Sequence, residues 1–167
     1  MELNEAGDNE ITGMRELGRL AVREGIPSRP LFGKLPLTRT IPQDVHSVMD
    51  YAGALVAGIA GMTADDDAAR ACGLTLMAVG AGTAAMTDYR LSLAKVLPIE
   101  GHEVADYLWS LTAMVSPFLF GYHRRSPVAA AVHVVAGAST LFAALFTDYR
   151  ARRGVTFRGP GRASDLF

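Results

Sequence analysis

Residues 128–146 read VAAAVHVVAGASTLFAALF, and the polar sequence Thr147-Asp148-Tyr149-Arg150 follows them directly. The apolar stretch has no polar face at helical spacing, and a helix that is apolar on all sides is either deeply buried or in lipid. Its length is close to the roughly 20 residues that an α-helix needs to cross a bilayer core. This stretch therefore predicts a transmembrane helix with a polar end.

Three further apolar segments precede it, at residues 45–62, 68–86 and 102–122. The first and the third carry Asp50 and Asp106 about one turn inside, so each is a marginal span when taken alone. A soluble four-helix bundle is the alternative, but it requires polar outer faces at helical spacing. The 167 residues also provide no second layer to bury four such helices. The sequence therefore predicts an all-α fold of four transmembrane helices in contact with a lipid bilayer.

Small residues recur at helical spacing within these segments, as in Gly53, Ala57 and Gly61, and again in Ala78 and Gly82. In water each glycine would weaken a helix by about 1 kcal/mol relative to alanine. In a membrane, small residues let helix backbones approach closely. This composition favours the membrane interpretation.

The chain contains an internal repeat. Pro42, His46, Asp50 and Tyr51 recur at one constant shift as Pro98, His102, Asp106 and Tyr107, and Thr87-Asp88-Tyr89-Arg90 recurs as Thr147-Asp148-Tyr149-Arg150. We interpret residues 42–90 and 98–150 as two tandem helical hairpins. In an up-down-up-down bundle both copies of each motif lie at the same end, in one polar layer. Two like-oriented hairpins are related by a pseudo-twofold axis along the membrane normal.

Polar segments flank the predicted bundle of residues 42–150. Residues 1–41 form a leader in which NEITGMRELGRLAVREG reads as a short amphipathic helix, and residues 151–167 form a basic tail. The leader opens with MELNEAGDNE, which is acidic and polar, unlike a secretory signal. Lysine and arginine gather in the leader, the middle loop and the tail, so the positive-inside rule predicts that both termini and the polar layer are cytoplasmic.

Several classes of function are disfavoured. The net charge is -1 and no basic patch is interleaved with aromatic residues, so we expect no nucleic-acid partner. Cys72 is the single cysteine, which rules out an internal disulfide and a cysteine-based zinc site. The chain has no glycine-rich phosphate loop and no nucleophile–base motif, so we expect no enzyme.

The stretches IPQDVHSVMDYAGALVAG, TDYRLSLAKVLPIEGHEVADYL and SPFLFGY resemble the bacterial SPW-repeat membrane proteins. Each repeat of that family is a hairpin with a Ser-Pro-Trp or similar triplet late in its first helix. Ser116-Pro117-Phe118 corresponds to this triplet in the second repeat, whereas the first repeat has Ala60-Gly61-Met62. The resemblance covers about residues 40–150 and implies a multi-pass protein of the bacterial inner membrane, with no implied activity.

The repeated polar motif supplies the candidate site. His46 and Asp50 are four residues apart and share a helix face, as do His102 and Asp106. Two imidazoles and two carboxylates suit several divalent metal ions. The histidine pair could instead clamp a haem iron, and ionisable groups within spans also mark ion or proton paths. The structural alternative is that the histidines simply hydrogen-bond the aspartates.

Further residues complete the set. His133, within the fourth segment, is a candidate haem or pigment ligand, and an interhelical hydrogen bond is its alternative role. The remaining members of the polar layer are Asp88, Tyr89, Arg90, Asp148, Tyr149 and Arg150. The tyrosines suit an aromatic belt and the arginines suit positive-inside anchors. The two aspartates end helices, where the dipole disfavours them, so we expect partners from the arginines or from the histidines of the layer.

Two functions are consistent with this pattern. The first is a structural or accessory subunit of a larger membrane complex, which accounts for the small-residue helix faces and the lack of a catalytic set. The second is a self-contained protein that binds a metal or haem, or transfers ions or protons, through the duplicated His/Asp layer.

Overall fold

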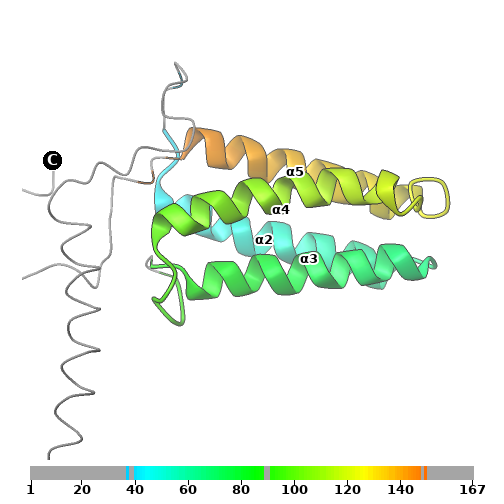
Figure 1. Cartoon of the computed structure of the whole chain (residues 1–167), viewed down its shortest axis with the longest axis horizontal. Coiled ribbons are helices and arrows are strands. Elements are labelled where there is room, and N and C mark those ends of the chain that lie inside the picture. The colour runs from blue at the N-terminus through cyan, green and yellow to red at the C-terminus, as the bar shows by residue number, and fades with distance from the viewer. Residues whose placement is uncertain (1–36, 38–39, 89–90, 148, 150–167) are drawn as a thin grey trace, which may run out of the picture. The chain divides into compact units, whose positions relative to one another are not determined.

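A computed structural model describes residues 37, 40–88, 91–147 and 149. Within these residues the chain forms four helices and no strand: α2 (Gln43–Met62), α3 (Asp67–Met86), α4 (Ile99–Leu119) and α5 (Pro127–Phe146). Figure 1 shows them in chain order. The all-α fold is therefore confirmed, whereas the predicted leader helix and the basic tail lie outside the described residues.

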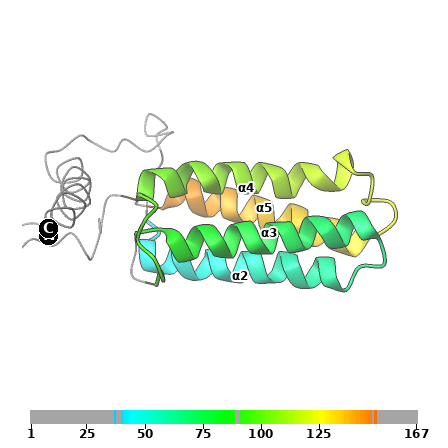
Figure 2. The same ribbon diagram turned by 60° about the horizontal axis from the view of Figure 1, so that its bottom comes forward.

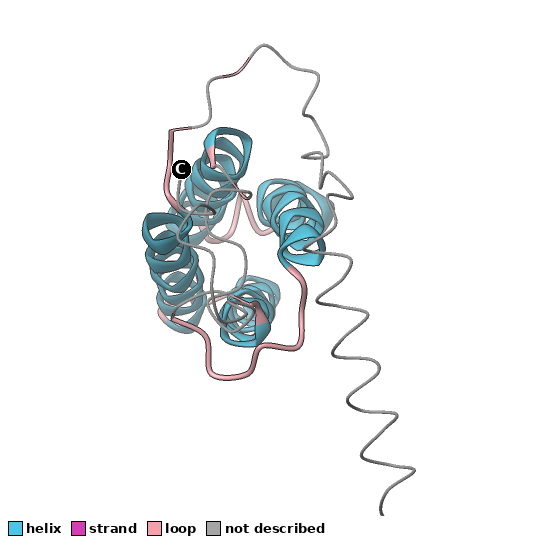
Figure 3. Cartoon of the chain, turned by 90° about the vertical axis from the view of Figure 1, so that its left-hand side faces the viewer, coloured by secondary structure: helices cyan, strands magenta, loops and turns pink. Residues whose placement is uncertain are grey.

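The four helices lie side by side, and each runs opposite to the one before it (Figures 1 and 2). α2 packs against α3 and α5, and α4 packs against the same two helices. α2 and α4 therefore face each other across the bundle axis. Figure 3 views the bundle end-on. The starts of α2 and α4 lie at the same end as the final residues of α3 and α5 (Figure 1).

Local sequence explains where the helices begin. Pro42 and Pro98 precede α2 and α4 with extended backbone angles. The Asp66 carboxylate caps α3 by accepting a hydrogen bond from the Ala69 backbone N–H at 3.0 Å. Pro127 is the first residue of α5, where its missing N–H would have no helical partner anyway.

The third helix differs from its predicted bounds of 102–122, because α4 begins at Ile99 and ends at Leu119. Gly121 adopts a positive φ of 68°, a conformation that ends helices and that glycine adopts without strain. The chain then turns, and Tyr122 folds back into the bundle with none of its surface exposed.

Three helices, α2, α3 and α5, are long and apolar enough to cross a membrane. α5 is the most apolar, as its sequence predicts. α4 falls outside this group, since its first turns carry Glu100, Glu103 and Asp106. The predicted spans are thus supported for three helices, and the crossing by α4 stays a prediction.

The distribution of side-chain size suits a lipid environment. The buried residues are mostly small or polar, while large apolar side chains face outward: Val45, Leu55, Ile59, Leu108, Leu111, Val128 and Val135 are all at least 46% exposed. In water such a surface would be a large apolar patch of the kind that marks interaction or membrane sites. Apolar helix surfaces therefore indicate contact with a bilayer.

Glycines set the closest helix contacts. A Cβ on Gly73 would lie 2.6 Å from the Gly61 Cα, so the backbones of α3 and α2 touch there. A Cβ on Gly137 would lie 2.7 Å from the Ser110 carbonyl oxygen, which brings α5 equally close to α4. Around Gly82, in contrast, no atom lies within 4 Å of the corresponding position.

Candidate functional site

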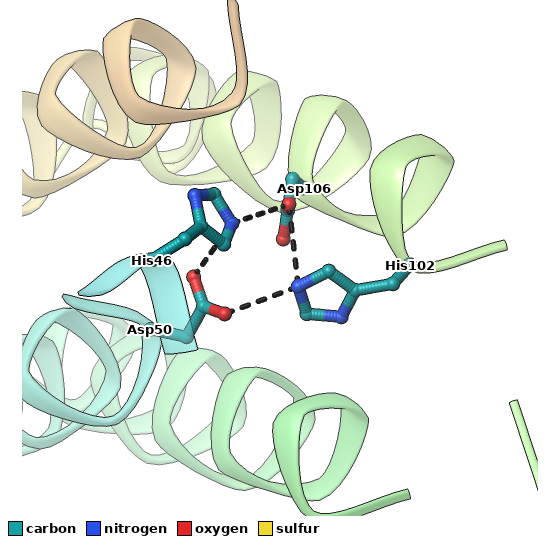
Figure 4. Close-up of side chains that lie close together, drawn as sticks. All are labelled: His46, Asp50, His102 and Asp106. Carbon is teal, nitrogen blue, oxygen red and sulfur yellow. Dashed lines mark hydrogen bonds and ion pairs between the residues drawn. The ribbon is translucent and has the colours of Figure 1, made fainter. Parts of the chain in front are cut away.

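The central polar feature is the His–Asp cluster, which consists of His46 and Asp50 from α2 and His102 and Asp106 from α4 (Figure 4). It lies in the bundle interior, one turn from the end at which these helices begin. His46 and His102 are each 1% exposed, and Asp50 and Asp106 are 8% and 5% exposed. The fold therefore brings together the four residues that the repeat predicted as a candidate site.

The shortest contacts in the cluster cross from one helix to the other. His46 Nε2 lies 2.9 Å from Asp106 Oδ2, and His102 Nε2 lies 3.0 Å from Asp50 Oδ2. The contacts within each helix are longer, at 3.2 Å in α2 and 3.4 Å in α4. Each carboxylate thus bridges both imidazoles, which the helical spacing alone did not predict.

Two threonines fix the orientation of the imidazole rings. Thr147 Oγ1 lies 2.8 Å from His46 Nδ1, and Thr87 Oγ1 lies 2.8 Å from His102 Nδ1. Each hydroxyl also donates its one proton to a carbonyl of its own helix, that of Ala143 or Thr83, at 2.6 and 2.7 Å. The hydroxyl must therefore accept from the ring, so Nδ1 carries a proton and Nε2 faces the carboxylates.

This arrangement fixes the proton content of the cluster. An Nε2···carboxylate contact at hydrogen-bond distance requires a proton between the two atoms, whichever of them holds it. Two such protons balance the two carboxylates, so the cluster is formally neutral. Neutrality matters here because an unbalanced buried charge is strongly destabilising.

Tyr149 covers the cluster from the chain that follows α5. Its hydroxyl donates to Asp106 Oδ2 at 2.8 Å and lies 3.5 Å from His46 Nε2. Gln43 Nε2 donates to the Tyr149 carbonyl at 2.6 Å. Burial, followed by the nearby Asp106 charge, raises the pKa of this phenol. The prediction that Tyr149 belongs to an aromatic belt is wrong, because its side chain packs inside the bundle with 3% of the residue exposed.

Asp88 has a partner that the sequence analysis did not anticipate. Lys95 Nζ lies 3.7 Å from Asp88 Oδ1, across the segment between α3 and α4. Tyr89, Arg90, Asp148 and Arg150 lie outside the described residues. Their assignment to the polar layer therefore stays a prediction.

A small cavity adjoins the cluster. Its volume is about 20 Å³, and its lining includes Asp50, His102, Asp106, Thr83 and Thr140. That volume accommodates a water molecule. The His46 and His102 ring centroids are 5.6 Å apart and both Nε2 atoms contact aspartates, so the geometry does not favour the haem clamp.

His133 belongs to a second buried network, the Tyr122–His133 network. Its Nε2 lies 3.1 Å from the Ala57 carbonyl oxygen and its Nδ1 lies 2.7 Å from the Tyr122 hydroxyl, which in turn is 2.9 Å from Ser116 Oγ. Since a carbonyl only accepts, Nε2 donates to it, and Nδ1 accepts from the phenol. Both ring nitrogens are thus engaged, and α5 is tied to α2 as the interhelical alternative requires. Burial raises the pKa of Tyr122 to about 12.

The two hairpin loops at the far end are joined by an ion pair. The Arg125 guanidinium hydrogen-bonds the Asp66 carboxylate and the Phe120 carbonyl. The hydrogen bond from Arg125, together with that from the Ala69 backbone, holds the pKa of Asp66 below its usual value. This exposed ion pair connects one hairpin loop to the other.

The contacts that the sequence analysis missed come from Gln43, Thr87, Lys95 and Thr147. A signal existed for the threonines, because both open the repeated Thr-Asp-Tyr-Arg motif.

Comparison of the chain with protein-family models, curated proteins and solved structures gives no match.

Proposed function

We propose that this chain is a multi-pass protein of a bacterial inner membrane, with both termini in the cytoplasm, and that it serves as a structural or accessory subunit of a larger membrane complex. On this proposal it has no catalytic activity of its own. The resemblance to the SPW-repeat proteins and the concentration of lysine and arginine near the termini support the location and orientation.

The proposal includes two tandem hairpins, 42–90 and 98–150, as the unit of construction. The contacts of the His–Asp cluster occur in matched pairs, which supports this view. His46 pairs with Asp106 as His102 pairs with Asp50. Likewise, each hairpin supplies the threonine that holds the histidine of the other.

The accessory role is supported chiefly by the small residues on the outer face of α3. Ala71, Thr75, Ala78 and Gly82 are spaced by four, three and four residues, so they share one face of the helix. The first three are exposed, and Gly82 has no atom of this chain near the position of a Cβ. Small residues on a lipid-facing helix favour close packing with another transmembrane helix. Large aliphatic side chains that suit lipid are exposed on α2 and α4, and on α3 they lie beside this face at Leu74 and Val79.

The test is native purification of the full chain in mild detergent with a bulky substitution on this face. The wild type is expected to co-migrate with a larger complex, and Gly82→Leu is expected to release it as a smaller species without unfolding it. Val128→Leu, at a 77%-exposed position on α5, is the matched control and keeps the complex. Migration of the wild type as a single chain, or full retention of the complex by Gly82→Leu, would contradict the accessory role.

A second candidate function is binding of a metal ion by the duplicated layer. The convergence of two imidazoles and two carboxylates from α2 and α4 favours it.

A further inference from the structure

We propose that the His–Asp cluster is a binding site for one divalent ion of the zinc class, with His46 Nε2, His102 Nε2 and one oxygen each from Asp50 and Asp106 as ligands. This inference rests on the second candidate function, metal binding by the duplicated layer, and is independent of the accessory role. In the structure, four ligand-type atoms from these residues all lie within 4.8 Å of one another.

The nitrogen–oxygen distances among these atoms are close to those of a four-coordinate site. With metal–nitrogen and metal–oxygen bonds of about 2.0–2.1 Å, the edge of the tetrahedron is about 3.3 Å. Asp106 Oδ2 lies 2.9 Å from His46 Nε2 and 3.4 Å from His102 Nε2. Asp50 Oδ2 lies 3.0 Å from His102 Nε2, and the other Asp50 oxygen, Oδ1, lies 3.2 Å from His46 Nε2. An ion placed among them would replace the shared protons and draw the four ligand atoms, which lie within 4.8 Å of one another, closer together.

The correct nitrogen of each histidine is already presented. Thr147 and Thr87 hold the Nδ1 protons, which leaves the two Nε2 atoms, pointed at the carboxylates, as the ligand atoms. An outer hydrogen-bond partner that fixes the tautomer and orientation accompanies almost every metal-bound histidine. Tyr149 plays the same part for a carboxylate, since its hydroxyl donates to Asp106 Oδ2.

The donor set selects the class of ion. Two imidazoles with two carboxylates suit zinc and similar borderline ions. Magnesium and calcium prefer six or more oxygen ligands and are poorly served by imidazole. The charges also agree, because the two carboxylates neutralise a divalent ion in a site that is nine-tenths buried. The cavity of about 20 Å³ beside Asp50 and Asp106 has room for one water molecule next to the site.

The experiment uses the full-length protein in mild detergent, stripped with a chelator and then loaded with Zn²⁺ or Co²⁺. We expect one Zn²⁺ per chain by elemental analysis. We also expect the intense visible absorption of tetrahedral Co²⁺, with addition of Zn²⁺ abolishing it. The double variant His46→Ala/His102→Ala is expected to lose both signals. His133→Ala is the matched control, since it removes a buried histidine of the other network and should keep one ion per chain.

Two further variants separate metal binding from folding. Asp50→Asn keeps the shape of the side chain and is expected to weaken Zn²⁺ binding at least 100-fold. Thr147 contacts Nδ1 of His46 and no metal-binding atom. Thr147→Val is therefore expected to weaken Zn²⁺ binding by about 10- to 100-fold without abolishing it. Absence of stoichiometric Zn²⁺ from the folded wild type would overturn the site, as would weak octahedral-type Co²⁺ absorption. Equal Zn²⁺ affinity in folded Asp50→Asn and wild type would overturn it as well.

Discussion

Thr147 Oγ1 accepts a hydrogen bond from His46 Nδ1 at 2.8 Å, although the two residues are 101 positions apart in the chain. Thr147 directly follows the last helix and His46 lies in the first turn of the first described helix, so this contact closes the bundle. Thr87 and His102 make the equivalent contact at the same distance. The cluster is thus held by both hairpins at once.

Replacement of Thr147 by valine should destabilise the protein. Valine fills the same volume but leaves the Nδ1–H of His46 buried without an acceptor, which costs about 1–3 kcal/mol. The free energy of unfolding in detergent, followed by circular dichroism, measures the loss. Thr112→Val is the control, because Thr112 is exposed and bonds only the Leu108 carbonyl of its own helix. If the two variants are equally stable, the threonine does not hold the ring.

A single methyl group on α3 should separate two helices. In Gly73→Ala the new Cβ would lie 2.6 Å from the Gly61 Cα and 2.7 Å from the Ala57 carbonyl oxygen, so α2 and α3 must move apart. Overpacking of this kind costs about 1–3 kcal/mol. Gly82→Ala makes the same change where no atom lies within 4 Å, and its effect should stay within about 0.5 kcal/mol. The same unfolding assay on both variants decides the point, and a neutral Gly73→Ala would refute the close approach.

Tyr122 should make stability depend on pH in the alkaline range. Its pKa is raised from 10.0 to about 12 by burial, so between these values the phenol ionises in the unfolded chain but not in the folded one. The unfolded state then binds fewer protons, and stability falls as the pH rises through this window. Below it, Tyr122 contributes no pH dependence.

Tyr122→Phe isolates this effect. The variant should lose about 1–3 kcal/mol at neutral pH, since His133 Nδ1 and Ser116 Oγ lose their partner. Its stability should also decline less than that of the wild type from pH 10 to 12. The comparison of unfolding free energies across this range measures both parts, and identical slopes for the two proteins would show that Tyr122 is not a buried phenol.

The sequence predicted the helices well because apolar length and the proline and glycine signals are local. It also placed both His-x3-Asp motifs at one end, since alternating helix direction forces that result. It did not predict that His46 pairs most closely with Asp106, because this contact depends on how α2 faces α4 across the bundle axis.

Residues outside the helices were harder to assign. Tyr122 was predicted as the last residue of the third helix and Tyr149 as a member of an aromatic belt, and neither prediction indicates that the ring turns inward. Both are nonetheless buried, with 0% and 3% exposure, and both complete a hydrogen-bond network. The Asp88–Lys95 contact was also missed, because it depends on the path of the segment between α3 and α4.

We propose above all that the four helices all cross the membrane and bring the His–Asp cluster to one membrane face. α4 decides this, because it is the helix outside the three candidate spans. Cysteine labelling in intact cells with a membrane-impermeant maleimide tests it most directly. The labelled positions are exposed ones, Asp65→Cys, Ala94→Cys and Arg124→Cys, each in a Cys72→Ala background. The account predicts that residues 65 and 124 react from outside and that residue 94 reacts only after the membrane is opened. Labelling of residues 94 and 124 from the same side would show that α4 does not cross, and would contradict the claim.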